Sequence, residues 1–437
     1  MTFNIKELIS QSAKLNSILA VRVVNGILGF IIAGLLASLL GANEFGIYVL
    51  ALTVVQISTI PMTLGLPNML TRRIASAISS NRHDLVFGLL SFSFRSVIAM
   101  TIFVIFIGLI TYDFTNQTSN NNLNSQYPFL PYLSALLVSV LALNARSMGI
   151  LLGFDKPLHS RIPESIVRPL GLIIFVLTAS IFFEVNAEIA IIAHILGALL
   201  AILIYMALLK FYSKKLLYVK KEYKIKLWIK ELIPFSVVSG VTKLNRYTDI
   251  LMLGYFIGAE AAGIYRVAVL FSSVMAMPIS ALGIVASPKF ASAQDESGLK
   301  TIKNEVLSLN KLVLFAQLII MAGLLILSPW ALNIFFGETF EAAFSPIAIL
   351  IIGTLLASVF SINEKALAMV GGVSSLSKLS LYSAILNIVL NILLIPFIGM
   401  LGAALALIIS KIFIAVSSYY VMKKNYKYGI NALNVAR

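Results

Sequence analysis

Long apolar stretches alternate with short polar ones along the whole sequence. A helix needs about 20 predominantly apolar residues to cross a bilayer, and twelve stretches come close to that length. They cover residues 15–40, 45–66, 87–111, 129–152, 164–183, 189–209, 232–257, 261–285, 309–330, 346–369, 379–396 and 401–422. The pattern therefore predicts an all-α polytopic membrane protein with about 12 transmembrane helices.

The composition agrees with a membrane protein and excludes several kinds of chemistry. Only 12% of the residues are charged, 59% are hydrophobic, and the mean hydropathy is +0.96. A soluble domain would carry roughly 25% charged residues. The chain lacks cysteine, which excludes disulfides, thiol nucleophiles and cysteine-based metal sites. Residues 1–17 are polar and amphipathic, so we expect no cleaved signal peptide.

Lysine and arginine fall almost entirely on one side of the predicted membrane. The six loops on the opposite side contain neither residue, whereas 25 of the 33 basic residues lie in the other loops, the termini or adjacent helix ends. Because basic loops stay in the cytoplasm, both termini are predicted to be cytoplasmic. The net charge of +15 thus reflects membrane topology, and we expect the lipid bilayer, not nucleic acid, as a partner.

The other eight basic residues lie inside the predicted spans, where acidic residues are fewer. Charges in a bilayer are costly, so they face protein or water and mark functional sites. Arginine and lysine bind phosphate oxygens, so a cationic cavity suits an anionic substrate. The candidate substrate-binding cations are Arg22, Arg95, Arg146, Arg168, Lys243, Arg246, Arg266 and Lys411, and the candidate ion-coupling or salt-bridge acids are Asp249, Glu164 and Glu364.

The seventh predicted span carries three charges near its middle. Lys243 has no acid three or four residues away, so we expect it to line a polar cavity. Arg246 and Asp249 are three residues apart and can form an ion pair. Asp249 is alternatively a carboxylate that couples transport to protons or sodium. Glu164 and Arg168, four residues apart in the fifth span, are predicted to pair with each other.

The two halves of the sequence resemble each other. GANEFGIY at residues 41–48 returns as GAEAAGIY at residues 258–265, and Leu64-Gly65 returns as Leu282-Gly283, at spacings of 217 and 218 residues. Six spans in each half give both halves the same topology, with a substrate site expected between them. The predicted division is an N-terminal six-helix lobe at 1–209, a lysine-rich cytoplasmic linker at 210–231, a C-terminal six-helix lobe at 232–422, and a cytoplasmic tail at 423–437.

Several stretches resemble one known superfamily. GANEFGIYVLA and GAEAAGIYRVA are similar to the repeated loop of the multidrug/oligosaccharidyl-lipid/polysaccharide exporters. RYTDILMLGYFIGAEAAGIY, FDKPLHSRIPESIVRPLGLI and LNIVLNILLIPFIGMLGAALALIISK resemble its polysaccharide branch, the Wzx-type O-antigen flippases. The resemblance implies two six-helix lobes that form a V around a central cavity, which the eight intramembrane basic residues would make cationic.

The resemblance also implies a function. The expected activity is translocation of an undecaprenyl-pyrophosphate-linked oligosaccharide, such as an O-antigen repeat unit, across the bacterial inner membrane by alternating access. A cation-coupled multidrug antiporter of the same superfamily is the alternative, and it would favour acids over cations in the cavity. We expect the flippase to act as a monomer beside a polysaccharide polymerase and chain-length proteins.

The sequence offers little support for an enzyme or a cofactor. Neither a Walker A motif nor a GxSxG elbow is present, and no loop has the length of a catalytic domain. His83, His159 and His194 are far apart in the sequence and lack a metal-ligand spacing. We therefore expect no enzymatic activity, no bound metal and no cofactor, while coupling to protons or sodium stays open.

Overall fold

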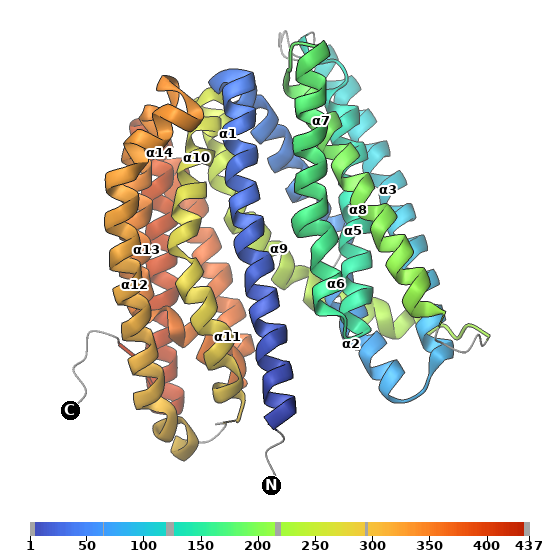
Figure 1. The fold of residues 1–437 in the computed structure, drawn as a ribbon, viewed down its shortest axis with the longest axis vertical. Coiled ribbons are helices and arrows are strands. Elements are labelled where there is room, and N and C mark those ends of the chain that lie inside the picture. Colours follow the sequence, from blue (N-terminus) through green and yellow to red (C-terminus); the bar gives the residue numbers. More distant parts are fainter. Residues whose placement is uncertain (1–4, 64, 119–125, 215–219, 293–295, 432–437) are drawn as a thin grey trace. The chain divides into compact units, whose positions relative to one another are not determined.

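A computed structural model describes the chain except residues 1–4, 64, 119–125, 215–219, 293–295 and 432–437. Every secondary-structure element among the described residues is a helix (Figure 1). The all-α prediction is therefore confirmed. The described residues divide into two compact units, residues 1–243 and residues 244–437.

The described part of the N-terminal unit contains both long and short helices (Figure 1). Helix α5 packs against α1, α2, α3 and α8, so it forms the centre of this unit. The elements are α1 (Ile5–Thr63), α2 (Leu66–Ser79), α3 (His83–Thr118), α5 (Leu130–Gly153), α6 (Pro157–Ile162), the π-helix η1 (Pro163–Val167), α7 (Arg168–Phe182), α8 (Ala187–Ser213) and the first part of α9 (Ile225–Phe256).

The C-terminal unit is organised around α13, which packs against α10, α11, α12 and α14. Besides the rest of α9, its elements are α10 (Ala259–Met275), α11 (Met277–Ser292), α12 (Glu296–Phe336), the 3₁₀-helix η2 (Glu338–Ala343), α13 (Phe344–Met369) and α14 (Val373–Tyr426).

Two of the longest helices break at a glycine. Helix α1 leaves the helical conformation at Gly41 (φ 73°, ψ 171°), and α14 does so at Gly399 (φ 56°, ψ −131°). Positive φ is costly for residues with a side chain, so glycine is suited to both breaks. In α14 the hydroxyl of Ser383 donates to the carbonyl of Ser410, 2.9 Å away. The two arms of α14 therefore lie side by side.

Eight described helices are long and apolar enough to cross a membrane, and nine if the bent pair formed by α10 and the start of α11 counts as one span. At 59 and 54 residues, α1 and α14 each have the length for two crossings of about 20 residues. Helix α9 is not among the eight, because Lys243, Arg246 and Asp249 interrupt its apolar sequence. The count of twelve spans stays a prediction.

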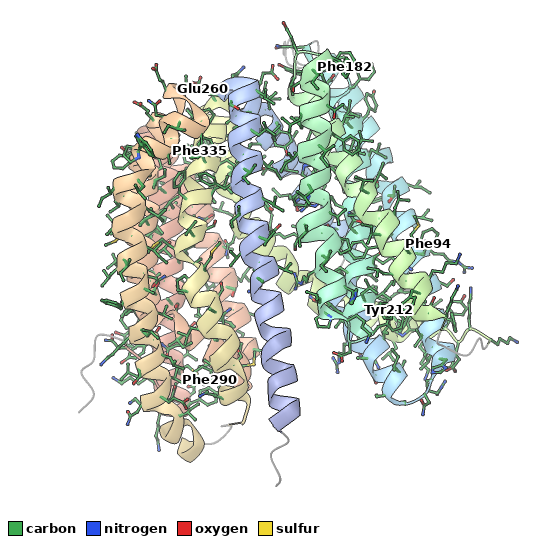
Figure 2. The ribbon with its side chains drawn as sticks, viewed as in Figure 1. Phe94, Phe182, Tyr212, Glu260, Phe290 and Phe335 are labelled. Carbon is green, nitrogen blue, oxygen red and sulfur yellow. The ribbon has the colours of Figure 1, made fainter. Side chains whose placement is uncertain are left out.

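The outer surfaces of the helices are apolar, as a lipid environment requires. Phe94 and Phe182 point away from the N-terminal unit (Figure 2) and are 48% and 71% exposed. In the C-terminal unit Phe335 and Trp330 are similarly exposed. Exposed apolar surface of this extent would destabilise a soluble monomer, so these faces are suited to contact with lipid.

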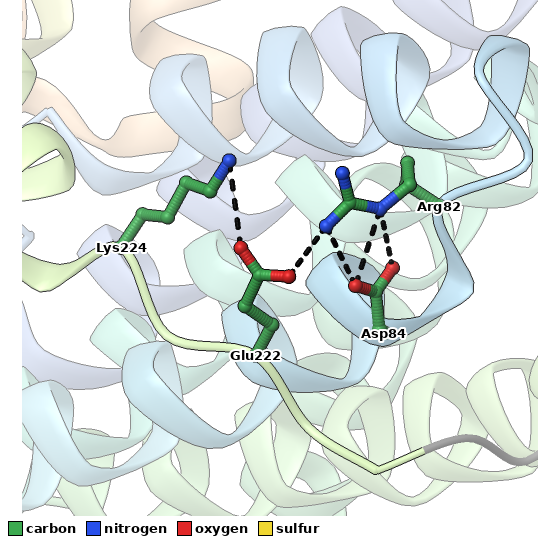
Figure 3. A network of polar contacts seen from close by, with 4 residues as sticks. All are labelled: Arg82, Asp84, Glu222 and Lys224. Atoms are coloured by element: carbon green, nitrogen blue, oxygen red, sulfur yellow. Dashed lines mark hydrogen bonds and ion pairs between the residues drawn. The ribbon is translucent and has the colours of Figure 1, made fainter.

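The lysine-rich segment before α9 docks onto α3 at the predicted cytoplasmic side. Arg82 donates to both Asp84 and Glu222, and Lys224 lies 3.5 Å from the other oxygen of Glu222 (Figure 3). The backbone N–H of Glu222 donates to the carbonyl of Asp84. Trp228 is buried against Phe92, with ring centroids 5.1 Å apart. These contacts fix the described part of the segment to the N-terminal unit.

A second ion pair joins the start of α9 to α2. The guanidinium of Arg73 binds both carboxylate oxygens of Glu231, one of them at 2.7 Å. The hydrogen bond from Arg73 lowers the pKa of the Glu231 carboxyl, and the positive charge of Arg73 adds to this effect. Two bonds from one guanidinium also fix the relative orientation of the two side chains.

The end of α14 is followed by a segment that packs back onto the C-terminal unit. Tyr428 and Ile430 are each 1% exposed and belong to a core with Phe290 and Leu367. The Asn363 amide donates to the carbonyl of Ile430 and accepts from its N–H. Residues 428–430 therefore form part of the packed core.

Candidate functional site

The polar centre of the N-terminal unit depends on a close approach of α7 and α8. A Cβ at Gly197 would lie 2.6 Å from the carbonyl oxygen of Arg168, and one at Gly171 would lie 2.9 Å from the Cα of Gly197. Such distances are too short for any side chain, so the two helices are in backbone contact. This contact brings His194, one turn before Gly197, within reach of Arg168.

The helix is also wound differently just before Arg168. Residues Pro163–Val167 form a π-helix, and the N–H of Arg168 donates to the carbonyl of Pro163, five residues earlier. Pro169 follows directly and has no N–H for the carbonyl four residues before it. The wider π turn accommodates this missing bond, and such turns are frequent at functional sites.

Four side chains form a polar chain in this region, two of them half-buried (Glu164 and Arg168) and two buried (His194 and Tyr48). Arg168 lies 3.0 Å from Glu164, and its second terminal nitrogen lies 2.8 Å from Nε2 of His194. A guanidinium can only donate, so Nε2 accepts and the ring proton is on Nδ1. Nδ1 then donates to the hydroxyl of Tyr48, 3.0 Å away. The pairing of Glu164 with Arg168 follows the sequence prediction, and Arg168 is consequently neutralised and held in place.

Lys243 lies at a polar pocket in the same unit, as its position in the seventh span predicts. The pocket has a volume of about 110 Å³. Lys243 donates to the hydroxyl of Thr59. The lining residues are Gln56, Thr59, Thr63, Leu141, Asn144, Ala145, Met148, Glu164 and Lys243. One cation, one carboxylate and several neutral polar groups thus meet around a single cavity.

The C-terminal unit has a different polar cluster, centred on Asp249. This carboxylate is 2% exposed and accepts a 2.7 Å hydrogen bond from the amide of Asn391. Asn391 donates also to Asn387, one turn earlier on α14, and Tyr265 of α10 lies beside the same carboxylate. Lys411 lies close enough to interact electrostatically with Asp249.

The ion pair between Arg246 and Asp249 is not among those of the described residues. Asp249 is turned into the unit, where Asn391 donates to it, while Arg246 is exposed. Residues three apart lie about 60° from each other around a helix, so this spacing allows an ion pair but does not require one. Here α14 supplies a neutral donor instead.

The remaining sequence candidates are spread over both units. Arg22 and Arg95 are exposed, whereas Arg146 donates to the hydroxyl of Ser93 and the carbonyl of Leu90 on α3. Arg146 therefore binds α3 and is no member of the pocket. In the C-terminal unit the candidates Arg266, Lys411 and Glu364 are half-buried.

Sequence reasoning missed Tyr48, His194, Asn387 and Asn391 as site residues. The sequence marks His194 only as a histidine without metal-ligand spacing, and the asparagines carry no charge that would mark them. The internal repeat is a sequence feature that could have indicated the two tyrosines. Tyr48 and its repeat counterpart Tyr265 end the same Gly-Ile-Tyr sequence, and each is buried next to the polar cluster of its unit.

Comparison with solved structures supports the fold. The chain is similar to an inward-facing multidrug resistance MATE family transporter of the MOP superfamily, with a TM-score of 0.70, 12% identity and 94% of each chain covered. It is also similar to the lipid II flippase MurJ in an inward closed conformation, with a TM-score of 0.69, 16% identity, and 93% of this chain and 87% of the other covered. At identities this low, these TM-scores show a shared fold.

Sequence comparison gives the family. An uncharacterized membrane protein of Methanocaldococcus jannaschii is 25% identical over 402 residues, which cover 85% of this chain and 76% of that protein. The teichuronic acid biosynthesis protein TuaB of Bacillus subtilis is 29% identical over 156 residues, about a third of each chain. Residues 13–294 match the family described as polysaccharide biosynthesis protein. This match covers well over half of the sequence, and the chain belongs to that family of multi-pass membrane proteins.

Proposed function

We propose that the protein is a flippase for undecaprenyl-pyrophosphate-linked oligosaccharides, such as an O-antigen repeat unit, and that it works by alternating access. The observation that carries this proposal is Lys243 beside a polar pocket in a chain of the polysaccharide biosynthesis family with a transporter fold. The similar structures include a lipid II flippase, which supports a lipid-linked substrate. The proposed location is the bacterial inner membrane, with the chain acting as a monomer beside a polymerase and chain-length proteins.

The chemistry of such a substrate explains the distribution of charge. A pyrophosphate is anionic and strongly hydrated, so it cannot cross hydrocarbon without compensating groups. Lys243 offers a compact positive charge with three donors. It lies on an interrupted apolar helix, where a charge is tolerated if it faces a water-filled cavity. We assign Lys243 the role of binding the pyrophosphate during translocation.

Asp249 is proposed to couple transport to an ion. Buried carboxylates inside membranes are costly and typically belong to proton or cation pathways. Asn391 donates its amide N–H to this carboxylate, and Asn387 and Tyr265 lie beside it. The carboxylate is thus held by neutral side chains and can take up and release an ion. Exchange of that ion would then drive the substrate-binding cycle.

A cation-coupled multidrug antiporter is the second candidate. It is favoured by Glu164, a carboxylate that lines the pocket and that would attract a cationic drug. Against it, Glu164 is already paired with Arg168, and Lys243 contributes a cation to the same pocket. Uptake of a cationic dye by proteoliposomes, with no activity toward lipid-linked sugars, would favour the antiporter.

A deletion strain tests the function directly. Cells without the protein, and without a redundant flippase, should accumulate undecaprenyl-linked repeat units on the cytoplasmic face of the membrane. Surface polysaccharide should fall, and expression of the intact chain should restore it. Unchanged surface polysaccharide in that strain would rule the flippase out.

The orientation can be tested in the same protein because it has no cysteine. A single cysteine at Thr118 should react with a membrane-impermeant maleimide added outside the cell. One at Ser213 should react only after the membrane is opened. Reaction of both from the outside would contradict cytoplasmic termini.

A further inference from the structure

The segment that follows α14 is bound by the C-terminal unit through its side chains and its backbone. Tyr428 and Ile430 are each 1% exposed. Gly429 lies between them against Tyr419, where a Cβ would be only 2.8 Å from a ring carbon. Asn363 of α13 binds the backbone of Ile430 twice, donating to its carbonyl at 2.8 Å and accepting from its N–H at 3.0 Å. The unit therefore holds this segment much as a protein holds a peptide ligand.

The partners of the segment come from three further helices. Tyr428 meets Phe290 of α11 edge to face, with ring centroids 6.0 Å apart. The same core contains Ala286 of α11, Val306 of α12 and Leu367 of α13. Residues 427–430 therefore add to the contact between α11 and the rest of its unit.

Helix α11 is separated from α10 by a break. The two helices meet at an angle of 44° around Ala276, and Pro278 has no N–H for the carbonyl four residues before it. Just before the break, Gln317 of α12 is 0% exposed and donates to the carbonyl of Met275 at 2.7 Å. The end of α10 is thus fixed to α12, and a movement at the break would displace α11 alone.

The position of α11 depends more on apolar packing than on its ion pair with α12. Lys289 of α11 pairs with Glu305, and their side chains are 31% and 55% exposed. Ion pairs at such positions contribute little to stability. Tyr428 and Ile430 pack on the same helix as buried apolar side chains, whose contribution is larger. We therefore expect α11 to be held less firmly whenever residues 427–430 leave their site.

Two features of the bound segment lower the cost of releasing it. The hydroxyl of Tyr428 is buried and has no hydrogen-bond partner among the described residues, and burial without a partner is unfavourable for a polar group. Lys427 has a φ of 48°, a conformation that costs energy for a residue with a side chain. Both costs disappear when the segment leaves its site.

We propose that residues 427–430 form a releasable latch at the predicted cytoplasmic end of the C-terminal unit. When the latch is bound, it holds α11 against α12 and α13. When it is released, α11 is free to pivot at the break after Met275 while α10 stays in place. The ligand of this site is a segment of the chain itself, so the inference is independent of the substrate that the protein transports.

Two buried alanines, one on each side of the break, can report on the latch because the chain has no cysteine of its own. Ala286 of α11 and Ala268 of α10 are both 0% exposed, and each is replaced by cysteine in a separate protein. A buried thiol reacts with a maleimide only when its surroundings open, so the rate follows the population of the open state. Both thiols should react slowly in the purified protein in detergent.

Removal of the latch should affect the two thiols differently. In a chain that ends at Tyr426, the thiol of Ala286→Cys should react more than about tenfold faster, since the burial of two large side chains is lost. The thiol of Ala268→Cys should react as slowly as before, because Gln317 still fixes the end of α10.

Point substitutions separate the latch from general packing. Asn363→Ala removes both bonds to Ile430 and should speed the reaction of Ala286→Cys by about fivefold or more, the size of one neutral hydrogen bond. Tyr428→Phe keeps the ring but removes the hydroxyl without a partner, so it should slow the same reaction. Asn425→Ala, an exposed change in the last turn of α14, is the control and should leave the rate unchanged.

Three results would contradict the latch. If loss of residues 427–437 speeds both thiols equally, the segment stabilises the whole unit and does not act on α11. If neither thiol reacts faster, the segment does not hold α11 at all. If Tyr428→Phe speeds the reaction, the hydroxyl keeps the segment bound and the latch is not set for release. None of these results bears on the flippase function, which the deletion strain tests separately.

Discussion

Tyr48 and its repeat counterpart Tyr265 lie beside polar clusters of different composition. Tyr48 accepts from His194 in the N-terminal unit, next to an ion pair and a cavity. Tyr265 lies next to the buried Asp249 in the C-terminal unit. The two halves also differ at a second pair of equivalent positions. His194 corresponds to Lys411, since these residues are 217 positions apart, as Tyr48 and Tyr265 are. A duplicated scaffold thus carries two different chemistries at equivalent places.

The difference indicates a division of roles. In the N-terminal unit the charge of Glu164 is balanced by Arg168, and neutral polar groups line a cavity, which suits a polar ligand. In the C-terminal unit a carboxylate is enclosed by asparagine side chains, which suits a small ion. We infer that the first cluster recognises substrate and the second couples transport to an ion.

The largest expected effect comes from reversing the charge of Lys243. Lys243→Glu places a second carboxylate at the pocket beside Glu164, and like charges brought together cost several kcal/mol. Binding of undecaprenyl pyrophosphate should weaken by more than about 100-fold, while Lys243→Arg should retain part of it. Lys226→Glu, at an exposed position on the same helix, is the control and should bind normally. Full transport by a stable Lys243→Glu protein would remove Lys243 from the substrate path.

A smaller effect is expected from neutralising Asp249. Asp249→Asn keeps the shape of the side chain and an acceptor for Asn391, so the protein should insert at normal abundance. Coupling energies of about 1–3 kcal/mol predict a 5- to 150-fold loss of gradient-driven transport. Undecaprenyl pyrophosphate binding should be retained. Glu260→Gln, an exposed change in the first turn of α10, should leave transport intact, and equal losses in the two variants would argue against an ion site.

The role of His194 in the N-terminal unit can be tested separately, because each ring nitrogen has its own hydrogen bond. A glutamine side chain at this position would present an acceptor near the place of Nε2 and keep Arg168 oriented, so His194→Gln should transport nearly normally. His194→Asn places its polar group nearer Nδ1 and leaves Arg168 without this acceptor. A lost hydrogen bond to a charged group predicts a loss of about tenfold or more. Equal transport by both variants would show that His194 does not position Arg168.

The smallest expected effect is on protein stability and comes from the ion pair between Arg73 and Glu231 in the N-terminal unit. Because Arg73 lowers the pKa of Glu231 below its ordinary value of 4.5, the pair stabilises the folded state above that value. The contribution is lost as pH falls through the lowered pKa. Glu231→Gln should therefore reduce Tm in detergent at pH 7, by an amount equivalent to about 1 kcal/mol or less, and the difference should vanish in strong acid. A difference that persists there would show a packing effect.

The helical class of this protein and two features of its charged residues follow from the sequence. Apolar length alone predicts the long helices, and the lone position of Lys243 predicts its place at a polar cavity. The i,i+4 spacing correctly predicts the pairing of Glu164 with Arg168. These features are local, so a pattern along one helix is sufficient to predict them.

The rest depends on contacts between helices that are distant in sequence. Asp249 is hydrogen-bonded to Asn391, 142 residues away, and not to the nearby Arg246. His194 reaches Arg168 only because Gly171 and Gly197 let two helices touch. Neutral asparagines and a single histidine carry no periodic signal, so their roles emerge only once the helices are packed.

The most direct measurement is the appearance of lipid-linked N-acetylglucosamine on the outer face of proteoliposomes, detected with an added galactosyltransferase and radiolabelled UDP-galactose. The unaltered protein should expose the sugar, and a sodium or proton gradient should accelerate this. Asp249→Asn should bind the lipid but lose the acceleration, whereas Lys243→Glu should fail to bind and to transport. A Lys243→Glu protein that binds normally, or an Asp249→Asn protein that still responds to both gradients, would contradict the division of roles between the two units.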